Sequence, residues 1–237
     1  MKHFTMTLIA GMGLITASAI TVLADESHAG GNQLMQNQTH WYEKAADTKG
    51  DVPEVKGKDL LTLQSGSFLY LEGNSTLHKY QMHANALKAA AALKGPEKDL
   101  AKALKAGAVE SMVLVVPVKD LKSRESGLDD NAYKALKLKD NPEIKFTLKS
   151  ESLKAGKDAG SYVMTAKGAL SIAGETQPVT LTGDTTVKDG QVRLKGIQKL
   201  KMSDYKVVPP SISLLVASIT CTDEVEIHYD VVFGTKK

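Results

Sequence analysis

The sequence contains one cysteine, few aromatic residues and no large excess of either charge. With Cys221 alone among 237 residues, an internal disulfide and any metal site built from several thiolates are excluded. Thirty basic and 27 acidic residues give a formal net charge of +3, which argues against a dedicated nucleic-acid binder. Apolar runs are interrupted by Gly, Ser and Thr before they reach the roughly 18 residues of a membrane-spanning helix.

Motifs of the common enzyme classes are also missing. There is no Gly-x-Ser-x-Gly elbow, no glycine-rich phosphate loop, no His-Glu-x-x-His and no dinucleotide fingerprint. Cys221 paired with a histidine would be a nucleophile, and His78, His83 and His228 would be metal ligands if they converged. The simpler interpretation makes Cys221 a small strand residue and puts His228 on the polar face of its strand. We therefore predict no catalysis, no metal and no cofactor, while Cys221 leaves a disulfide-linked homodimer open.

The N-terminal segment has the features of a secretory signal peptide. Lys2 and His3 form a short basic start, residues 4–20 are mostly small or apolar without an acid, and Ala24 ends a short stretch suited to cleavage. We predict a signal peptide over residues 1–24, with an uncleaved membrane anchor as the alternative. Residues 25–58 are polar and show no apolar period, which indicates a flexible leader before a domain spanning 59–237.

Alternating hydrophobicity dominates the chain from residue 59 onward. Three stretches show it most clearly, over residues 144–148, 162–172 and 225–233. Such period-two patterns predict antiparallel strands with one dry and one wet face. Residues 112–118 are apolar in both phases, as in a strand that is buried on both faces.

Turn and helix signals separate these strands. Asp189-Gly190 predicts a tight hairpin, and Gly174-Glu175 predicts another. One helix is predicted from Gly95-Pro96 to Gly107, and residues 84–93 either extend it or finish a strand. A second helix is predicted from about Leu128 to Leu138, with an apolar face able to cover one end of a barrel.

About eight strands with one continuous dry face predict a closed antiparallel barrel, because closure removes the edge strands. An eight-stranded barrel is either filled by its own side chains or holds one small ligand, and the pattern alone leaves both open. An outer-membrane barrel would need two aromatic girdles. Seven Tyr, four Phe and one Trp are too few for them.

Several short motifs, in order, resemble those of the YceI-like family over about residues 59–233. They are Gly-Asn-Ser-Thr-Leu-His at 73–78, Asn-Pro-Glu-Ile-Lys-Phe at 141–146, Gly-Ala-Leu-Ser-Ile-Ala-Gly-Glu-Thr at 168–176, Met-Ser-Asp-Tyr at 202–205, Pro-Pro-Ser at 209–211, and the strand at 223–233. The sequence departs from the family pattern at Lys79-Tyr80, where Asp-Trp is expected.

The resemblance implies an all-β, antiparallel eight-stranded lipocalin-like barrel with one or two short helices. It also implies export to the periplasm and binding of a long isoprenoid lipid, of polyprenyl or quinone type, inside the barrel. The expected ligand-binding residues are those on the dry face of the strands: Leu69, Leu71, Leu114, Val116, Ile144, Phe146, Leu148, Tyr162, Met164, Leu170, Ile172, Val225, Ile227, Tyr229 and Phe233.

The space for such a ligand is expected beside the small inward residues Gly73, Ala166 and Gly168. Tyr70, Tyr162 or Tyr229 would supply the few polar anchors. The alternative is a filled barrel that serves as an exported structural or stress adaptor.

Two charged features have a simple surface interpretation. Asp129 and Asp130 occupy the first turn of the second helix, where carboxylates suit the helix dipole better than they would form an acid–base pair. A set of lysines either forms a solvated face or makes transient contact with an anionic membrane surface. These lysines are Lys134, Lys137, Lys139, Lys145 and Lys149.

Overall fold

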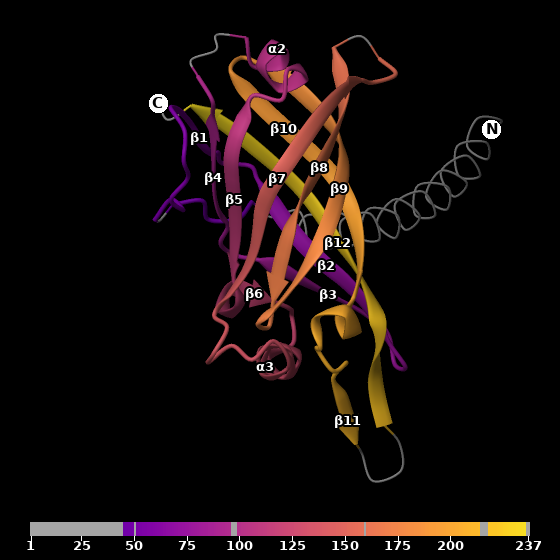
Figure 1. Cartoon of the computed structure of the whole chain (residues 1–237). Helices are drawn as coiled ribbons and strands as arrows, with labels where there is room; N and C mark the ends of the chain where they lie inside the picture. The colour runs from indigo at the N-terminus through magenta and orange to yellow at the C-terminus, as the bar shows by residue number, and fades with distance from the viewer. Residues whose placement is uncertain (1–44, 50, 96–98, 159, 214–217, 236–237) are drawn as a thin grey trace, which may run out of the picture. The chain divides into compact units, whose positions relative to one another are not determined.

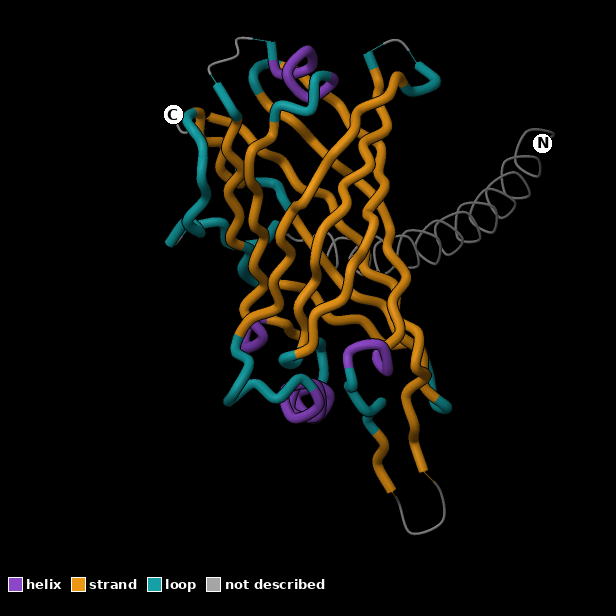
Figure 2. Tube along the Cα trace, in the orientation of Figure 1, coloured by secondary structure: helices purple, strands orange, loops and turns teal. Residues whose placement is uncertain are grey.

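The computed structural model describes residues 45–49, 51–95, 99–158, 160–213 and 218–235. Strands make up most of this part of the chain, and its helices lie at the two ends of the sheet (Figures 1 and 2). The strands are β1 (Asp59–Leu63), β2 (Phe68–Ser75), β3 (Lys79–Ala84), β4 (Lys88–Leu93), β5 (Val109–Pro117), β6 (Leu121–Lys122), β7 (Glu143–Ala155), β8 (Ser161–Ile172), β9 (Glu175–Lys188), β10 (Gln191–Lys201), β11 (Ser211–Ser213) and β12 (Ser218–Thr235). The helices are α2 (Leu100–Lys105), α3 (Ser126–Ala135) and the 3-10 turns η1 (Val118–Asp120) and η2 (Met202–Tyr205).

These strands close into an eight-stranded antiparallel barrel, as predicted, because some of its eight strand positions are occupied by two short strands in succession. β1 and β2 both pair with β12 and share one strand position. β3 and β4 share the next position, and β5 and β6 share the third. The ring continues through β7, β8, β9 and β10 back to β12. Because side chains alternate between the two faces of each strand, one face of every strand points into the barrel.

The tight turns follow the predicted chemistry. Asp189 and Gly190 have φ of 52° and 72°, and Ala173 and Gly174 have 51° and 90°. Two successive positive φ values are typical of the primed turns that join twisted antiparallel strands, and glycine adopts them without strain. The second turn is centred one residue earlier than the sequence predicted.

The two helices cover opposite ends of the barrel (Figure 1). α2 is only six residues long and begins at Asp99, whose carboxylate accepts a hydrogen bond from the Lys102 backbone N–H. α3 lies at the other end, near η2, and it begins two residues and ends three residues earlier than predicted. Among the residues with a described fold, no helix has the length and hydrophobicity that crossing a membrane requires.

The alanine-rich segment at 88–93 is strand β4, so the helical alternative for it is wrong. Its backbone pairs with β1 on one side and β5 on the other, and Ala89 to Ala92 are buried. Pairing on both sides outweighs the high helix propensity of alanine.

Part of the predicted leader packs on the barrel. Ala46 is buried and its N–H donates to the Ser67 carbonyl, while Asp47 pairs with Ala86 as an isolated bridge. Gly57 passes so close to Ala92 that a Cβ at this position would clash with the alanine methyl group. The predicted signal peptide and the leader up to residue 44 lie outside the described residues.

Candidate functional site

The interior of the barrel contains an apolar chamber. Its walls are aliphatic except for Phe146, Tyr229 and Gln198. The lining residues, here called the inner chamber, are Leu69, Leu71, Met112, Leu114, Val116, Leu121, Ile144, Phe146, Leu170, Ile172, Leu181, Leu194, Gln198, Leu200, Ile227, Tyr229 and Val231.

A second apolar space, here called the outer chamber, lies at the α3 and η2 end. It shares part of its lining with the inner chamber, namely Leu71, Leu121, Ile144, Ile172, Leu200 and Ile227. The remaining lining residues are Tyr80, Met82, Leu128, Ala132, Ala135, Leu136, Lys201, Met202, Tyr205, Val207, Pro210, Cys221 and Val225. The two chambers therefore adjoin, and together they are here called the apolar passage, which runs from the barrel interior to its α3 end.

Most residues of the predicted ligand-binding face line this passage. The inner chamber contains Leu69, Leu71, Leu114, Val116, Ile144, Phe146, Leu170, Ile172, Ile227 and Tyr229, and the outer chamber adds Val225. Leu148, Tyr162, Met164 and Phe233 line neither chamber. Met164 and Phe233 belong to the packed core, Tyr162 packs against it, and Leu148 precedes a bulge that shifts the phase of β7.

The small inward glycines do not leave the gaps expected from the sequence. A Cβ on Gly168 would lie 2.5 Å from the Phe146 ring, and one on Gly73 would lie 2.3 Å from the Tyr80 ring. Each glycine instead leaves room for an aromatic ring from the neighbouring strand.

Of the three tyrosines expected as polar anchors, two lie outside the chambers and the third already makes a hydrogen bond within the protein. Tyr70 is on the outer face, stacked on His228 with ring centroids 4.4 Å apart. Tyr162 lies near the α2 end, with the Lys105 ammonium 4.9 Å from its ring centroid. Tyr229 does line the inner chamber, but its hydroxyl donates to the Thr182 carbonyl at 3.1 Å.

Tyr80 and Cys221 form a polar pair in the wall of the outer chamber. Burial raises the pKa of the Tyr80 hydroxyl, and its hydrogen bond to Cys221 raises that pKa further. Burial also raises the pKa of the Cys221 thiol, which the hydrogen bond from Tyr80 only partly offsets. A thiol held in its protonated form is a poor nucleophile, and this supports the interpretation of Cys221 as a wall residue.

Sequence reasoning identified the apolar face of α3 but did not assign it to the site. Leu128, Ala132 and Leu136 share one face by their spacing, and the structure places that face against the outer chamber. From η2, Met202 and Tyr205 line the same chamber. Their only sequence signal is the Met-Ser-Asp-Tyr motif, which carries no periodic pattern.

Asp129 attaches α3 to the barrel. Its buried carboxylate accepts hydrogen bonds from the Ser123 backbone N–H and hydroxyl, both at 2.7 Å, and it pairs with Lys122 at 3.4 Å. The Tyr133 hydroxyl donates to the carbonyl of Leu121 at 2.8 Å. Asp129 thus has a structural role, in agreement with the sequence interpretation, although its partners lie before the helix and not within it.

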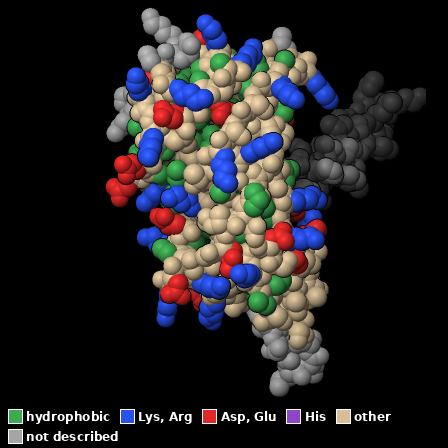
Figure 3. Space-filling view, viewed as in Figure 1, with side chains coloured by type: hydrophobic (Ala, Val, Ile, Leu, Met, Phe, Trp, Pro, Cys, Tyr) green, Lys and Arg blue, Asp and Glu red, His purple; other side chains and the backbone are tan. Residues whose placement is uncertain are grey.

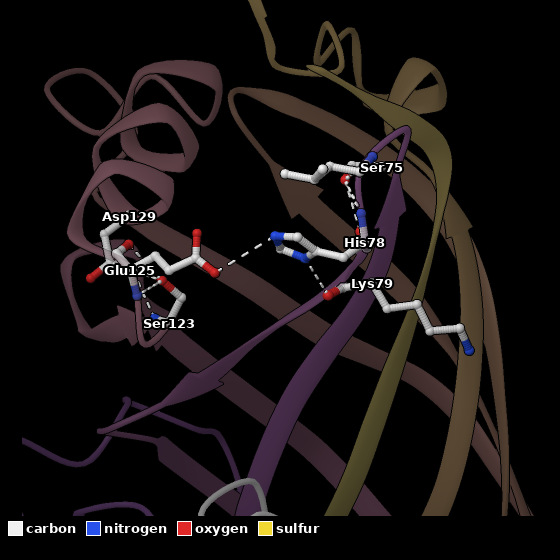
Figure 4. A network of polar contacts seen from close by, with 7 residues as sticks. Ser75, His78, Lys79, Ser123, Glu125 and Asp129 are labelled. Atoms are coloured by element: carbon white, nitrogen blue, oxygen red, sulfur yellow. Dashed lines mark hydrogen bonds and ion pairs between the residues drawn. The ribbon is translucent and has the colours of Figure 1, made fainter.

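A second, weaker link joins α3 to the β2–β3 turn (Figure 4). The Ser75 hydroxyl accepts hydrogen bonds from the backbone N–H groups of Leu77 and His78 and donates to the His78 carbonyl. The His78 ring contacts the Lys79 carbonyl through Nδ1 at 2.7 Å and lies 3.9 Å from the Glu125 carboxylate through Nε2. His78 is therefore a turn residue, as the sequence suggested.

The histidines do not gather into a metal site. His83 and His228 lie on the outer face of the barrel on either side of Tyr70, away from His78 in the turn. No group of three or more potential metal ligands occurs among the residues whose placement is described. Lysines on the visible face of the molecule are interspersed with acidic side chains and form no block of one sign (Figure 3).

Comparisons with known proteins give the fold and the family. BcnA of Burkholderia cenocepacia matches with 16% identity and a TM-score of 0.52, over 70% of this chain and 95% of its own. A domain of Saccharophagus degradans, described as a polyisoprenoid binding domain implicated in plant cell wall breakdown, matches with 10% identity and a TM-score of 0.55. That match covers 76% of this chain and all of the other.

No curated protein matches the chain at a significant level. The family model of the YceI-like domain matches residues 65–233, which span most of the chain and nearly all of the barrel. The order of strands, the apolar passage and this match agree, and the protein belongs to the YceI-like domain family.

Proposed function

We propose that this protein holds one long isoprenoid lipid, of polyprenyl or quinone type, inside its barrel and catalyses no reaction. The apolar passage formed by the adjoining inner and outer chambers carries this proposal. Burying hydrocarbon in such a passage contributes about 0.8 kcal/mol per CH₂ before the chain is ordered. The description of the S. degradans domain as polyisoprenoid binding supports the same chemistry.

The shape of the passage favours a chain over a compact ligand. The chambers are joined end to end through shared residues such as Leu71, Ile144 and Ile172, so an occupant of both must be long and thin. The alternative, a filled barrel acting as an adaptor, describes only the α2 end. There Leu93, Leu104 and other large side chains belong to the packed core.

The proposal includes export to the periplasm after cleavage behind Ala24. It is supported by the basic and apolar N-terminal pattern of the sequence, and residues 1–44 lie outside the described structure. N-terminal sequencing of protein from the periplasmic fraction should begin at Asp25. An N-terminus at Met1 in the membrane fraction would contradict it and favour the anchor.

Native mass spectrometry of the purified protein, followed by organic extraction, tests the lipid cargo. We expect a stoichiometric mass excess that extracts as an isoprenoid. Ile172→Trp should reduce this occupancy at least tenfold, because Ile172 lines both chambers and a larger side chain blocks the passage between them. Lys145→Trp, on the exposed face of β7, is the matched control and should retain the lipid.

The proposed function would be overturned if the measured mass equals that of the mature polypeptide alone, even after incubation with quinones and polyprenyl lipids. Equal occupancy in folded Ile172→Trp and Lys145→Trp variants would instead show that the lipid lies outside the passage.

A further inference from the structure

Backbone pairing between β9 and β10 covers only part of the two strands. The ladder runs from Gln191 opposite Lys188 to Gly196 opposite Gly183, where it ends. Beyond that point, residues 175–182 of β9 pair only with β8, and residues 197–201 of β10 pair only with β12. All of these residues are described, so the barrel wall has a seam here that no ladder of hydrogen bonds closes.

The sequence of β9 suits an unpaired edge. Pro178 lies within the seam and cannot donate a backbone hydrogen bond, and proline in a sheet is tolerated mainly on such edges. At the end of the seam toward η2, the Gln177 side chain donates to the Asp204 carbonyl at 2.9 Å. Lys206 reaches Glu175 at 2.8 Å. Side-chain contacts therefore take the place of backbone contacts at this end.

An open groove follows the outer side of the seam. It is lined from both strands and from η2, by Gln177, Pro178, Val179, Thr180, Gln198, Lys199, Leu200, Lys201, Asp204, Tyr205 and Glu224. Gln198 and Leu200 also line the inner chamber, and Tyr205 also lines the outer chamber. Only side chains separate the groove from the apolar passage.

Gln198 lines both the groove and the inner chamber, whereas Lys201 and Tyr205 line both the groove and the outer chamber. The Gln198 Nε2 donates to the neighbouring Lys199 carbonyl at 2.8 Å, and its Oε1 has no partner among the described residues. Tyr229, the other inner-chamber residue with a polar atom, already donates to Thr182. A polar group on a lipid held in the inner chamber would therefore find its partner at Gln198, at the seam.

The charges of the groove balance. Lys199 and Lys201 face Asp204 and Glu224, and Lys199 is already paired with Glu226 at 3.0 Å. Asp223 has a lowered pKa because Ser203 donates to it and, to a smaller extent, because Lys201 is close. A phosphate or diphosphate in the groove would lie near the Asp204 and Glu224 carboxylates as well as the two lysines, whereas an alcohol or a quinone carbonyl carries no charge for those carboxylates to repel.

We propose that the seam, residues 175–182 and 197–201, is the head-group site for an uncharged oxygen-bearing isoprenoid, which Gln198 contacts by a hydrogen bond. This inference rests on the proposed function, since it assigns one end of the lipid that the passage holds. It names the ligand class as an isoprenoid alcohol or quinone and excludes phosphorylated isoprenoids.

Three C20 probes with different ends test the site on the delipidated full mature protein, by titration calorimetry or native mass spectrometry. They are geranylgeraniol, geranylgeranyl diphosphate and the hydrocarbon phytane. The alcohol should bind at least about tenfold more tightly than the diphosphate at low salt. Gln198→Leu should weaken binding of the alcohol about fivefold, as expected for one hydrogen bond, without weakening binding of phytane.

Gln191→Leu is the matched control, because Gln191 is an exposed glutamine at the paired end of the same strand. It should leave all three affinities unchanged. Equal affinity for the alcohol and the diphosphate, or an equal loss for the alcohol and phytane in Gln198→Leu, would overturn the head-group site and leave the proposed function intact. Failure of all three probes to bind would overturn the proposed function itself.

Discussion

The α2 end and the α3 end of the barrel are built from the same alternating strands, yet the outer chamber lies at the α3 end. Toward the α2 end, Leu93, Leu153 and Phe233 belong to the packed core, together with Leu100 and Leu104 of α2. At the α3 end, the Phe146 and Tyr80 rings lie close to glycines of neighbouring strands, and α3 contributes small residues such as Ala132 and Ala135.

The same two halves differ in how their walls are joined. Between β9 and β10 the backbone ladder closes the α2 half, while the α3 half depends on side-chain contacts of η2 and on the attachment of α3 by Asp129. The α2 half therefore supplies stability, and the α3 half supplies space for a ligand. Substitutions in the two halves should therefore have different consequences.

The largest expected difference is between two leucine truncations. Leu93→Ala at the packed end should cost about 2–5 kcal/mol of unfolding free energy, because it leaves a cavity around a fully buried side chain. Leu114→Ala in the inner chamber should cost below about 2 kcal/mol, since its side chain partly faces existing space. Urea unfolding measures both, and equal losses would contradict the division of the barrel into two halves.

The attachment of α3 is the next largest effect. Asp129→Ala removes a buried acceptor of two hydrogen bonds and an ion-pair partner, and should cost about 1–3 kcal/mol. Release of bound lipid should become faster, because α3 forms part of the outer chamber. Asp130→Ala, at the exposed neighbouring position, should stay within about 0.5 kcal/mol. A similar loss in both variants would argue against a specific role of Asp129.

Alkaline pH should weaken the barrel through its buried tyrosines. Burial raises the pKa of Tyr229 to about 12, above its ordinary value of 10. The unfolded chain therefore releases this proton first, so stability is complete below pH 10 and declines as pH rises toward 12. We expect a loss on the order of 1–2 kcal/mol over this interval.

Urea midpoints between pH 9 and 12 measure this decline. Tyr229→Phe should flatten it in part, because Tyr80, whose pKa is also raised by burial, still contributes. An unchanged pH profile in Tyr229→Phe would mean that this hydroxyl does not titrate with folding.

The smallest effect is expected for the link between His78 and Glu125. The two groups lie 3.9 Å apart and their side chains are 48% and 62% exposed, so Glu125→Gln should cost no more than about 0.5 kcal/mol. The same unfolding assay measures it. A loss above about 1 kcal/mol would show that this contact, and not Asp129 alone, attaches α3.

Local patterns predicted the strands better than the helices. The alternation at 144–148, 162–172 and 225–233 predicted β7, β8 and β12, because a half-buried strand must repeat every two residues. Residues 84–93 were ambiguous because alanine favours a helix, and only pairing with β1 and β5 decided for a strand. A bulge between Leu148 and Ser150 shifts the phase of β7, and no residue type in that segment announces it.

The sequence by itself determined which face of each strand is dry, and with it the closed barrel and an apolar interior. Alternation states whether a side chain points inward but not how far along the barrel axis it lies. Only the tertiary structure therefore separated Ile172, which lines the passage, from Met164 on the same face of the same strand. The seam was likewise decided there, because pairing between β9 and β10 depends on how two strands diverge in space and not on either strand alone.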